Sequence, residues 1–196
     1  MLILSIDGLR PDAIFAAPMP NLLALMESSA YTLNAQTVYP SVTLVSHSSM
    51  LTGLCPSKHG VDWNDYIPSK GYANGTDLFD LAHAAGLQTV MYVGKEKLRQ
   101  ITEPGSTDFF GFVDNTDEEF DETTIESMTV GQIRAGFGLL MVHFPDGDVA
   151  GHQNDWMSKQ QLSALHKKDR SLGLFLDVMK DSGFYDGALI IVTSDH

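Results

Sequence analysis

The stretch ALIIVTSDH, residues 188–196, joins a run of apolar residues directly to an aspartate and a histidine. A short, continuous apolar run is typical of a strand that is covered on both faces. LILSIDG, residues 2–8, has the same form, because its apolar run also ends in an aspartate. FGLLMVHF, residues 137–144, is a third such run, and the polar stretch PDGDVAGH follows it. These runs predict three buried strands that carry polar side chains at their ends.

Helical patterns lie between the predicted strands. Apolar residues recur at helical spacing in four segments, which cover residues 20–30, 41–53, 76–86 and 158–183. A fourth strand, LQTVMYVG, follows the third of these helices. Strands that alternate with helices of this length indicate βαβ crossovers and parallel pairing. We therefore predict an α/β fold with three layers, a mostly parallel sheet with helices on both faces, formed as a single domain by residues 1–196.

The composition limits the possible classes of function. A net charge of −13 argues against binding to nucleic-acid polymers or acidic membranes, since both need a cationic surface. The single cysteine, Cys55, cannot form an internal disulfide. MLILSIDG is too short and too soon polar for a signal peptide or a membrane span, so we expect a cytoplasmic protein. The acidic residues 114–127 predict a solvated loop that leads into a helix.

Candidate metal ligands follow three of the predicted strands. In open α/β sheets, functional side chains gather at the carboxyl ends of the strands. Three carboxylates and two imidazoles are expected at that edge, from Asp7, Asp148, His152, Asp195 and His196. Each alone could be an ordinary turn or loop residue, but their joint occurrence at one edge favours a metal site. Zinc takes nitrogen and oxygen ligands of this kind, and manganese or iron would also accept them.

Two neighbouring polar residues need separate interpretation. Asp146 could compete with Asp148 as a ligand, but the i, i+4 spacing to His152 favours Asp148. His143 lies within a predicted strand, so we expect a core histidine whose hydrogen bonds are satisfied.

Thr43 lies at or near the first turn of a predicted helix, in the segment YPSVTLVSHSSMLTG. Unpaired backbone N–H groups and the positive end of the helix dipole favour an anion at this position. A threonine hydroxyl is too weak an acid to react at neutral pH, but a bound divalent cation can make its alkoxide accessible. In a simpler alternative, Thr43 or Ser41 only caps the helix.

With these residues placed, the sequence resembles the alkaline phosphatase superfamily, and most closely its type I phosphodiesterase/nucleotide pyrophosphatase branch. Four segments carry the resemblance in the family's order: LILSIDGLRPD, YPSVTLVSHSSMLTGLCPSKHGVDWN, DVAGH and TSDH. One such segment would be a weak signal, but four in order along the chain are specific. One departure is Val45-Ser46, where the family often has Pro-Asn before the next histidine.

The resemblance implies roles for the residues around the nucleophile. Thr43 would attack phosphorus and become transiently phosphorylated or nucleotidylated. Asn64 would donate a hydrogen bond to a phosphoryl oxygen. His47 and His59 would support the nucleophile segment without binding metal.

The resemblance also implies two divalent metal ions, zinc or alternatively manganese. Asp7, Asp195 and His196 would hold one ion together with the nucleophile oxygen. Asp148 and His152 would hold the second with a further histidine downstream. Because the family's TSDH segment normally continues, we expect residues 1–196 to be the amino-terminal portion of a longer enzyme.

The function implied by the resemblance is metal-dependent hydrolysis of a phosphodiester or nucleotide pyrophosphate through a covalent intermediate at Thr43. The substrate would be a small phosphate ester or a nucleotide. A phosphomonoesterase of the same superfamily and a non-catalytic domain that binds metal or nucleotide remain as alternatives. Monoesterases of the superfamily add a cation for the extra phosphate charge. Arg10 and Lys58 are the only candidates within the motifs, and both resemble surface residues, which favours diesters.

Overall fold

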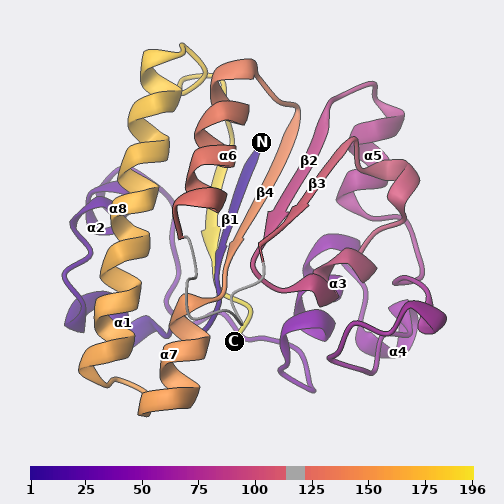
Figure 1. Cartoon of the computed structure of the whole chain (residues 1–196), viewed down its shortest axis with the longest axis horizontal. Helices are drawn as coiled ribbons and strands as arrows, with labels where there is room; N and C mark the ends of the chain where they lie inside the picture. The colour runs from indigo at the N-terminus through magenta and orange to yellow at the C-terminus, as the bar shows by residue number, and fades with distance from the viewer. Residues whose placement is uncertain (114–121) are drawn as a thin grey trace.

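Five parallel strands form one sheet in the computed structural model, which describes residues 1–113 and 122–196. Their order across the sheet is β3-β2-β4-β1-β5 (Figure 1). The strands are β1 (Leu2–Ile6), β2 (Thr89–Val93), β3 (Phe109–Phe112), β4 (Leu139–Phe144) and β5 (Ile190–Thr193). β1 pairs with both β4 and β5, so the three strands that precede the candidate ligands lie side by side.

Helices cover both faces of the sheet (Figure 1). One face carries α1 (Pro11–Ala16), α2 (Pro20–Glu27), α6 (Glu122–Ala135) and α8 (Lys159–Asp181). The other carries α3 (Thr43–Thr52) and α5 (Leu78–Ala84). Two short helices, α4 (Pro56–His59) and α7 (Asp146–Asn154), lie toward the carboxyl ends of the strands in Figure 1. The connections include 3₁₀ turns at Pro68–Lys70, Glu96–Gln100 and Pro104–Ser106.

The core is divided in two by the alternation of side chains along each strand. Leu2, Leu4 and Ile6 of β1 pack with the layer that contains α8, whereas Ile3 packs with the layer that contains α3 and α5. Because helices cover both faces, β1, β2 and β4 are buried along their whole length. Strands buried on both sides have no polar face, which explains their continuous apolar sequences.

The α/β class is confirmed, and so are the four predicted strands and the four predicted helices, with ends shifted by a few residues. The expected burial of the strand at 188–192 is wrong, because β5 lies at the edge of the described sheet and its Ile191 side chain is exposed. The sequence did not predict β3 at the edge of the sheet. It also did not predict α7, where PDGDVAGH suggested a loop. Of the expected acidic loop, residues 114–121 lie outside the described residues, and α6 begins at Glu122.

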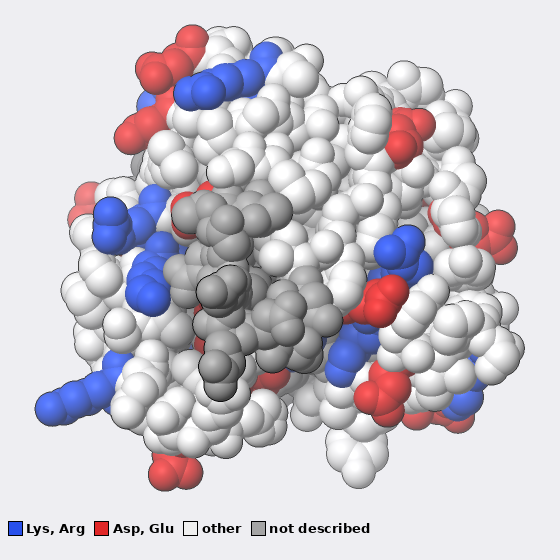
Figure 2. All heavy atoms as spheres, in the orientation of Figure 1, with Lys and Arg blue, Asp and Glu red and all other residues white. Residues whose placement is uncertain are grey.

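Positive and negative side chains are mixed on the visible surface of the described residues (Figure 2). On the face shown in Figure 2, the described Lys and Arg side chains lie in several separate groups with acidic side chains nearby. This distribution agrees with the net charge of −13. Within the two described ranges, every helix is too short or too polar to cross a membrane.

Candidate active site

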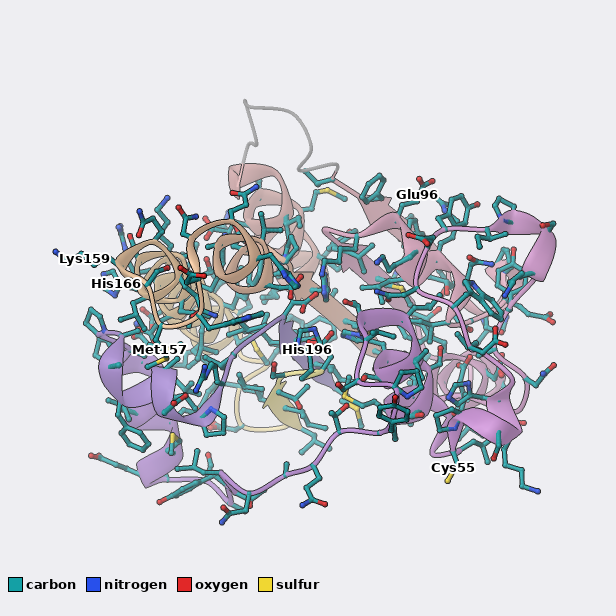
Figure 3. All side chains as sticks on the ribbon, turned by 90° about the horizontal axis from the view of Figure 1, so that it is seen from below. Cys55, Glu96, Met157, Lys159, His166 and His196 are labelled. Atoms are coloured by element: carbon teal, nitrogen blue, oxygen red, sulfur yellow. The ribbon has the colours of Figure 1, made fainter. Side chains whose placement is uncertain are left out.

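The carboxyl ends of β1, β4 and β5 meet at the lower edge of the sheet in Figure 1, near His196 in Figure 3. Asp7 directly follows β1, Asp195 and His196 follow β5, and Asp148 lies in the first turn of α7, after β4. His196 Nε2 is 3.2 Å from Asp7 Oδ1, 3.6 Å from Asp148 Oδ1 and 3.7 Å from Asp195 Oδ2. The structure therefore brings four of the five candidate metal ligands into one cluster.

His152, the fifth candidate ligand, lies in the last turn of α7. Its Nε2 atom is 3.3 Å from Asp148 Oδ1, as the i, i+4 spacing on a helix allows. The His152 side chain is 69% exposed, whereas Asp148 is buried. The competing carboxylate, Asp146, lies 3.3 Å from the ammonium of buried Lys168. The helical spacing therefore identified the carboxylate that reaches the cluster.

The donor atoms of the cluster suit a divalent cation. Asp7, Asp195 and His196 each offer a ligand atom, and these atoms lie within 4.8 Å of one another. Asp7 Oδ1, Asp148 Oδ1 and both carboxylate oxygens of Asp195 are buried without a hydrogen-bond partner among the described residues. Such oxygens are costly to bury unless a cation neutralises them. Carboxylate oxygen and imidazole nitrogen are ordinary ligands of zinc and manganese, so the residues fit such an ion.

The crowded carboxylates differ in acidity. Burial raises the pKa of Asp195 to about 6, and the nearby Asp7 carboxylate adds to the shift. Burial alone would also raise the pKa of Asp7, but His143, His196 and Lys95 hold it well below its usual value. The Asp7 carboxylate in turn raises the pKa of His196. Groups of opposite charge thus keep Asp7 ionised, whereas Asp195 takes up a proton more readily than an exposed aspartate does.

Thr43 is the first residue of α3, and its hydroxyl points to the carboxylate cluster. Thr43 Oγ1 lies 3.4 Å from Asp7 Oδ2, and the residue is buried. The N-cap position of α3 is Val42, and neither Ser41 nor Thr43 makes a capping hydrogen bond to the helix. The alternative in which Thr43 or Ser41 serves only as a cap is therefore wrong. The Thr43 hydroxyl is held beside Asp7 instead of the amides of its own helix.

Asn64 contacts the same helix start. Its Oδ1 atom accepts a hydrogen bond of 3.0 Å from the backbone N–H of Leu44, in the first turn of α3. An asparagine side chain has one acceptor atom and one donor nitrogen. Because the oxygen is bound to Leu44, the Nδ2 group remains as the part of Asn64 that can donate to a ligand beside Thr43.

His47 and His59 both contact α3. His47 is fully buried, with Nδ1 2.7 Å from the Thr43 carbonyl oxygen and Nε2 2.8 Å from Ser5 Oγ. Burial lowers the pKa of His47 to about 3, with a further contribution from nearby His143, so the ring is neutral. His59 Nε2 lies 2.9 Å from Ser49 Oγ in α3. These contacts agree with a supporting position for both rings.

His143 differs from its prediction as a core histidine with satisfied hydrogen bonds. It is buried in β4, but its Nε2 atom lies 3.1 Å from Asp7 Oδ2. Its Nδ1 atom has no hydrogen-bond partner among the described residues. In the register of the sheet, His143 pairs with Ser5, two residues before Asp7. This proximity depends on strand pairing, so no local sequence pattern indicated it.

Lys95 is a residue of the cluster that sequence reasoning missed. It lies two residues after β2, and its Nζ atom is 2.6 Å from Asp7 Oδ2 and 2.6 Å from Asp148 Oδ2. The same atom is 3.2 Å from Thr43 Oγ1. Burial alone would lower the pKa of Lys95, but the two carboxylates raise it above its usual value, so the ammonium stays charged. The strand-end rule applied to β2 would have identified it.

The two cations considered from the sequence lie elsewhere. Arg10 pairs with Asp12 at 2.7 Å, and both side chains are largely exposed. Lys58 is exposed near the end of α4. Among the described residues, neither side chain pairs with a candidate metal ligand.

Together, the fold and these donors define an α/β protein with a candidate metal centre at the carboxyl edge of its sheet. The sequence matches the family model of type I phosphodiesterase / nucleotide pyrophosphatase over residues 1–196. The chain therefore belongs to this family, as the resemblance of its four segments predicted.

Known relatives support the same assignment. Ectonucleotide pyrophosphatase/phosphodiesterase family member 1 of Rattus norvegicus is 28% identical over 218 residues, which cover 100% of this chain and 23% of the relative. Bis(5'-adenosyl)-triphosphatase of Xenopus laevis is 21% identical over 100% of this chain and 46% of the relative. The chain thus spans less than half the length of either relative.

A solved structure shows that the fold is shared. It is an inactive variant of murine ectonucleotide pyrophosphatase/phosphodiesterase 5 in complex with AMP. It matches this chain with a TM-score of 0.78 at 19% identity, over 100% of this chain and 56% of that one. At this identity, the likeness concerns the fold alone.

Proposed function

We propose that the protein hydrolyses phosphodiesters or nucleotide pyrophosphates through a covalent intermediate on Thr43, with bound divalent metal. The observation that carries the proposal is the position of Thr43 Oγ1. It lies at the start of α3 and 3.4 Å from Asp7, which is itself one of three clustered metal-donor residues. Family membership supports the reaction class. The AMP complex of the murine relative supports a nucleotide substrate.

Two ions would be held by the clustered side chains. Asp7, Asp195 and His196 would hold the first, and Asp148 and His152 would contribute to the second. We propose zinc, with manganese as the alternative, because the donors are carboxylate oxygen and imidazole nitrogen. Such ions supply Lewis-acid charge, which lowers the free energy of negative charge on nearby oxygen atoms.

In the first step, Thr43 Oγ1 attacks phosphorus and the bond to the leaving oxygen breaks, while the threonine proton passes to solvent and the departing group takes up a proton from solvent on release. The position of Thr43 at the start of α3 directs backbone dipoles toward the negative charge on the phosphoryl oxygens. The Asn64 Nδ2 group would donate to one of these oxygens, because the Leu44 N–H holds its other end.

In the second step, water attacks the same phosphorus and displaces the Thr43 oxygen, which regains a proton. Buried His47 supports this exchange only indirectly, since it holds the Thr43 carbonyl and stays neutral. The resting site is thereby restored with its hydroxyl again beside Asp7.

The test compares two threonines of the same helix in the complete gene product. Thr43→Ala should lower the hydrolysis of bis(p-nitrophenyl) phosphate by at least about 1,000-fold, as removal of a nucleophile does. Thr52→Ala, at the other end of α3, should retain activity because Thr52 Oγ1 donates to Ser48 O and accepts from the Leu54 N–H, and neither residue is a candidate site residue. Zinc content, measured by mass spectrometry of the metal, should be the same in both variants. Undiminished turnover in Thr43→Ala would disprove the assigned nucleophile.

A second measurement separates metal dependence from the identity of the nucleophile. Prolonged dialysis against a chelator should abolish hydrolysis, and added zinc or manganese should restore it. Mass spectrometry of acid-quenched protein should show phosphoryl or nucleotidyl adducts on Thr43. Full activity after verified metal removal would contradict the metal part of the proposal.

A further inference from the structure

Lys95 places a positive charge beside the candidate nucleophile. Its side chain is only 15% exposed, and its ammonium lies between Asp7 and Asp148, at 2.6 Å from each. An ammonium group has three donor hydrogens. Two suffice for the two carboxylates. The third can serve Thr43 Oγ1, which lies 3.2 Å away.

The two carboxylates use different oxygens for Lys95 and for the candidate metal ligands. Lys95 contacts Oδ2 of Asp7 and Oδ2 of Asp148. His196 lies near Oδ1 of both, and these Oδ1 atoms have no hydrogen-bond partner among the described residues. The Oδ1 atoms are thus the ones left for an ion. Lys95 and bound metal can therefore share the site without competing for the same oxygen.

We infer that Lys95 is a catalytic residue that binds the transferred phosphoryl group and contributes more to the cleavage of a dianionic phosphate than of a monoanionic one. This inference rests on the proposed function, since Lys95 would act on the phosphorus that Thr43 attacks. The phosphorus would lie next to Thr43 Oγ1, and an oxygen bonded to that phosphorus would fall within reach of the Lys95 ammonium. The third hydrogen of Lys95 then moves from the threonine oxygen to the phosphoryl oxygen.

Charge explains the preference for a dianion. The phosphoryl group of a monoester carries up to two negative charges at neutral pH, whereas that of a diester carries one. A charge-assisted hydrogen bond is stronger than a neutral one, and its strength rises with the charge on the acceptor. Removal of Lys95 should therefore weaken the monoester reaction more than the diester reaction.

The experiment compares Lys95→Met with Lys58→Met in the complete gene product. Lys58 is a matched control because it is an exposed lysine on α4. Lys95→Met should lower kcat/KM for p-nitrophenyl phosphate by about 10- to 100-fold. It should lower kcat/KM for bis(p-nitrophenyl) phosphate by less than about fivefold, and Lys58→Met should change neither value. Lys95→Arg should recover part of the monoester rate.

Binding of inorganic phosphate gives a readout that does not depend on turnover. Calorimetry on the zinc-loaded protein should show about tenfold weaker phosphate binding for Lys95→Met, with unchanged zinc content. Equal loss for both substrates, or unchanged phosphate affinity, would show that Lys95 only neutralises the carboxylates and would overturn the inference. If the wild-type protein cleaves neither ester, the proposed function fails, and the phosphate measurement still decides the role of Lys95.

Discussion

The two parts of the candidate metal centre are built in different ways. The inner group, Asp7, Asp195 and His196, follows the paired strands β1 and β5, whose register sets Ser5 opposite Thr193. The outer group, Asp148 and His152, lies on helix α7. Asp7 and Asp195 are buried, whereas the His152 side chain is 69% exposed. Backbone pairing positions the inner group, and the packing of a single helix positions the outer one.

The outer group is held by contacts at both ends of α7. Near its start, Asp146 lies 3.3 Å from Lys168 in α8. Near its end, the rings of His152 and Trp156 pack edge to face at 5.3 Å. Neither contact fixes His152 as firmly as a sheet fixes a strand end. The inner group is therefore the preformed part of the centre and should bind an ion first.

The largest effect should come from removal of a carboxylate of the inner group. Asp195→Asn should weaken zinc binding by at least about 100-fold, more than changes outside the ligand shell usually cost. His152→Ala should weaken the tightest binding step by less than about tenfold, because its exposed ring belongs to the outer group. Calorimetric titration of the metal-free protein measures both. Equal losses in the two variants would remove the distinction between the groups.

A backbone contact links the two groups at Gly8, which follows Asp7. Gly8 has φ +71°, and a Cβ atom there would lie 2.9 Å from Asp148 Cα. Gly8→Ala should lower the free energy of unfolding by about 2–3 kcal/mol, because strain and a backbone clash add. Gly53→Ala is the control, since Gly53 has φ +68° but a Cβ atom there would meet no other atom within 4 Å. It should lose about 1 kcal/mol in urea unfolding.

The Gly8 comparison also tests the coupling between the groups. Gly8→Ala should displace α7 and weaken the binding of a second zinc ion, while Gly53→Ala should not. If both variants lose the same stability and bind zinc alike, the approach of Gly8 to Asp148 has no role in placing the outer group.

Buried His47 should make the free energy of unfolding depend on pH. Burial, with nearby His143, lowers its pKa to about 3 in the folded protein, against about 6.5 in the unfolded chain. Between these values the unfolded chain binds a proton that the folded protein does not. The neutral His47 ring therefore makes its full contribution to the free energy of unfolding above pH 6.5, and this contribution is lost as the pH falls toward 3.

His47→Gln isolates this contribution. Between pH 7 and pH 5.5, the metal-free wild-type protein should lose about 1 kcal/mol more stability than the variant. Urea unfolding at both pH values, with chelator present, gives the difference. Equal losses would mean that His47 is not held in its neutral form.

The sequence could predict the inner group because each of its residues closely follows an apolar strand. The run at 2–6 is continuous because helices cover both faces of β1, and parallel pairing with β5 brings the ends of the two strands together. Prediction of the inner group requires no knowledge of long-range packing beyond this strand pairing. The same rule would have located Lys95 after β2, had it been applied to cations as well as to metal ligands.

Helix α7 and the contact of His143 with Asp7 could not be predicted, because both depend on packing that no local sequence pattern reveals. Helix α7 contains Gly147 and Gly151, which are poor helix formers and made the segment resemble a loop. A Cβ atom at Gly147 would lie 2.7 Å from the backbone oxygen of Asp7, and one at Gly151 would lie 2.6 Å from Trp156. Close packing therefore demands glycine at both positions. The contact of His143 with Asp7 was likewise not predicted, because it joins β4 to the end of the neighbouring strand β1.

The smallest effect is expected at Asn64, which holds the start of α3. Asn64→Ala removes the hydrogen bond from Leu44 N–H and should lower the free energy of unfolding by about 0.5–1 kcal/mol. Asn34→Ala, in an exposed connection, should change it by less than about 0.5 kcal/mol. Zinc affinity should stay within about twofold of wild type for both variants, because neither side chain is a ligand. If Asn64→Ala lost as much zinc affinity as Asp195→Asn, Asn64 would belong to the inner group that binds the ion. The division between residues that hold ions and residues that hold α3 would then be wrong.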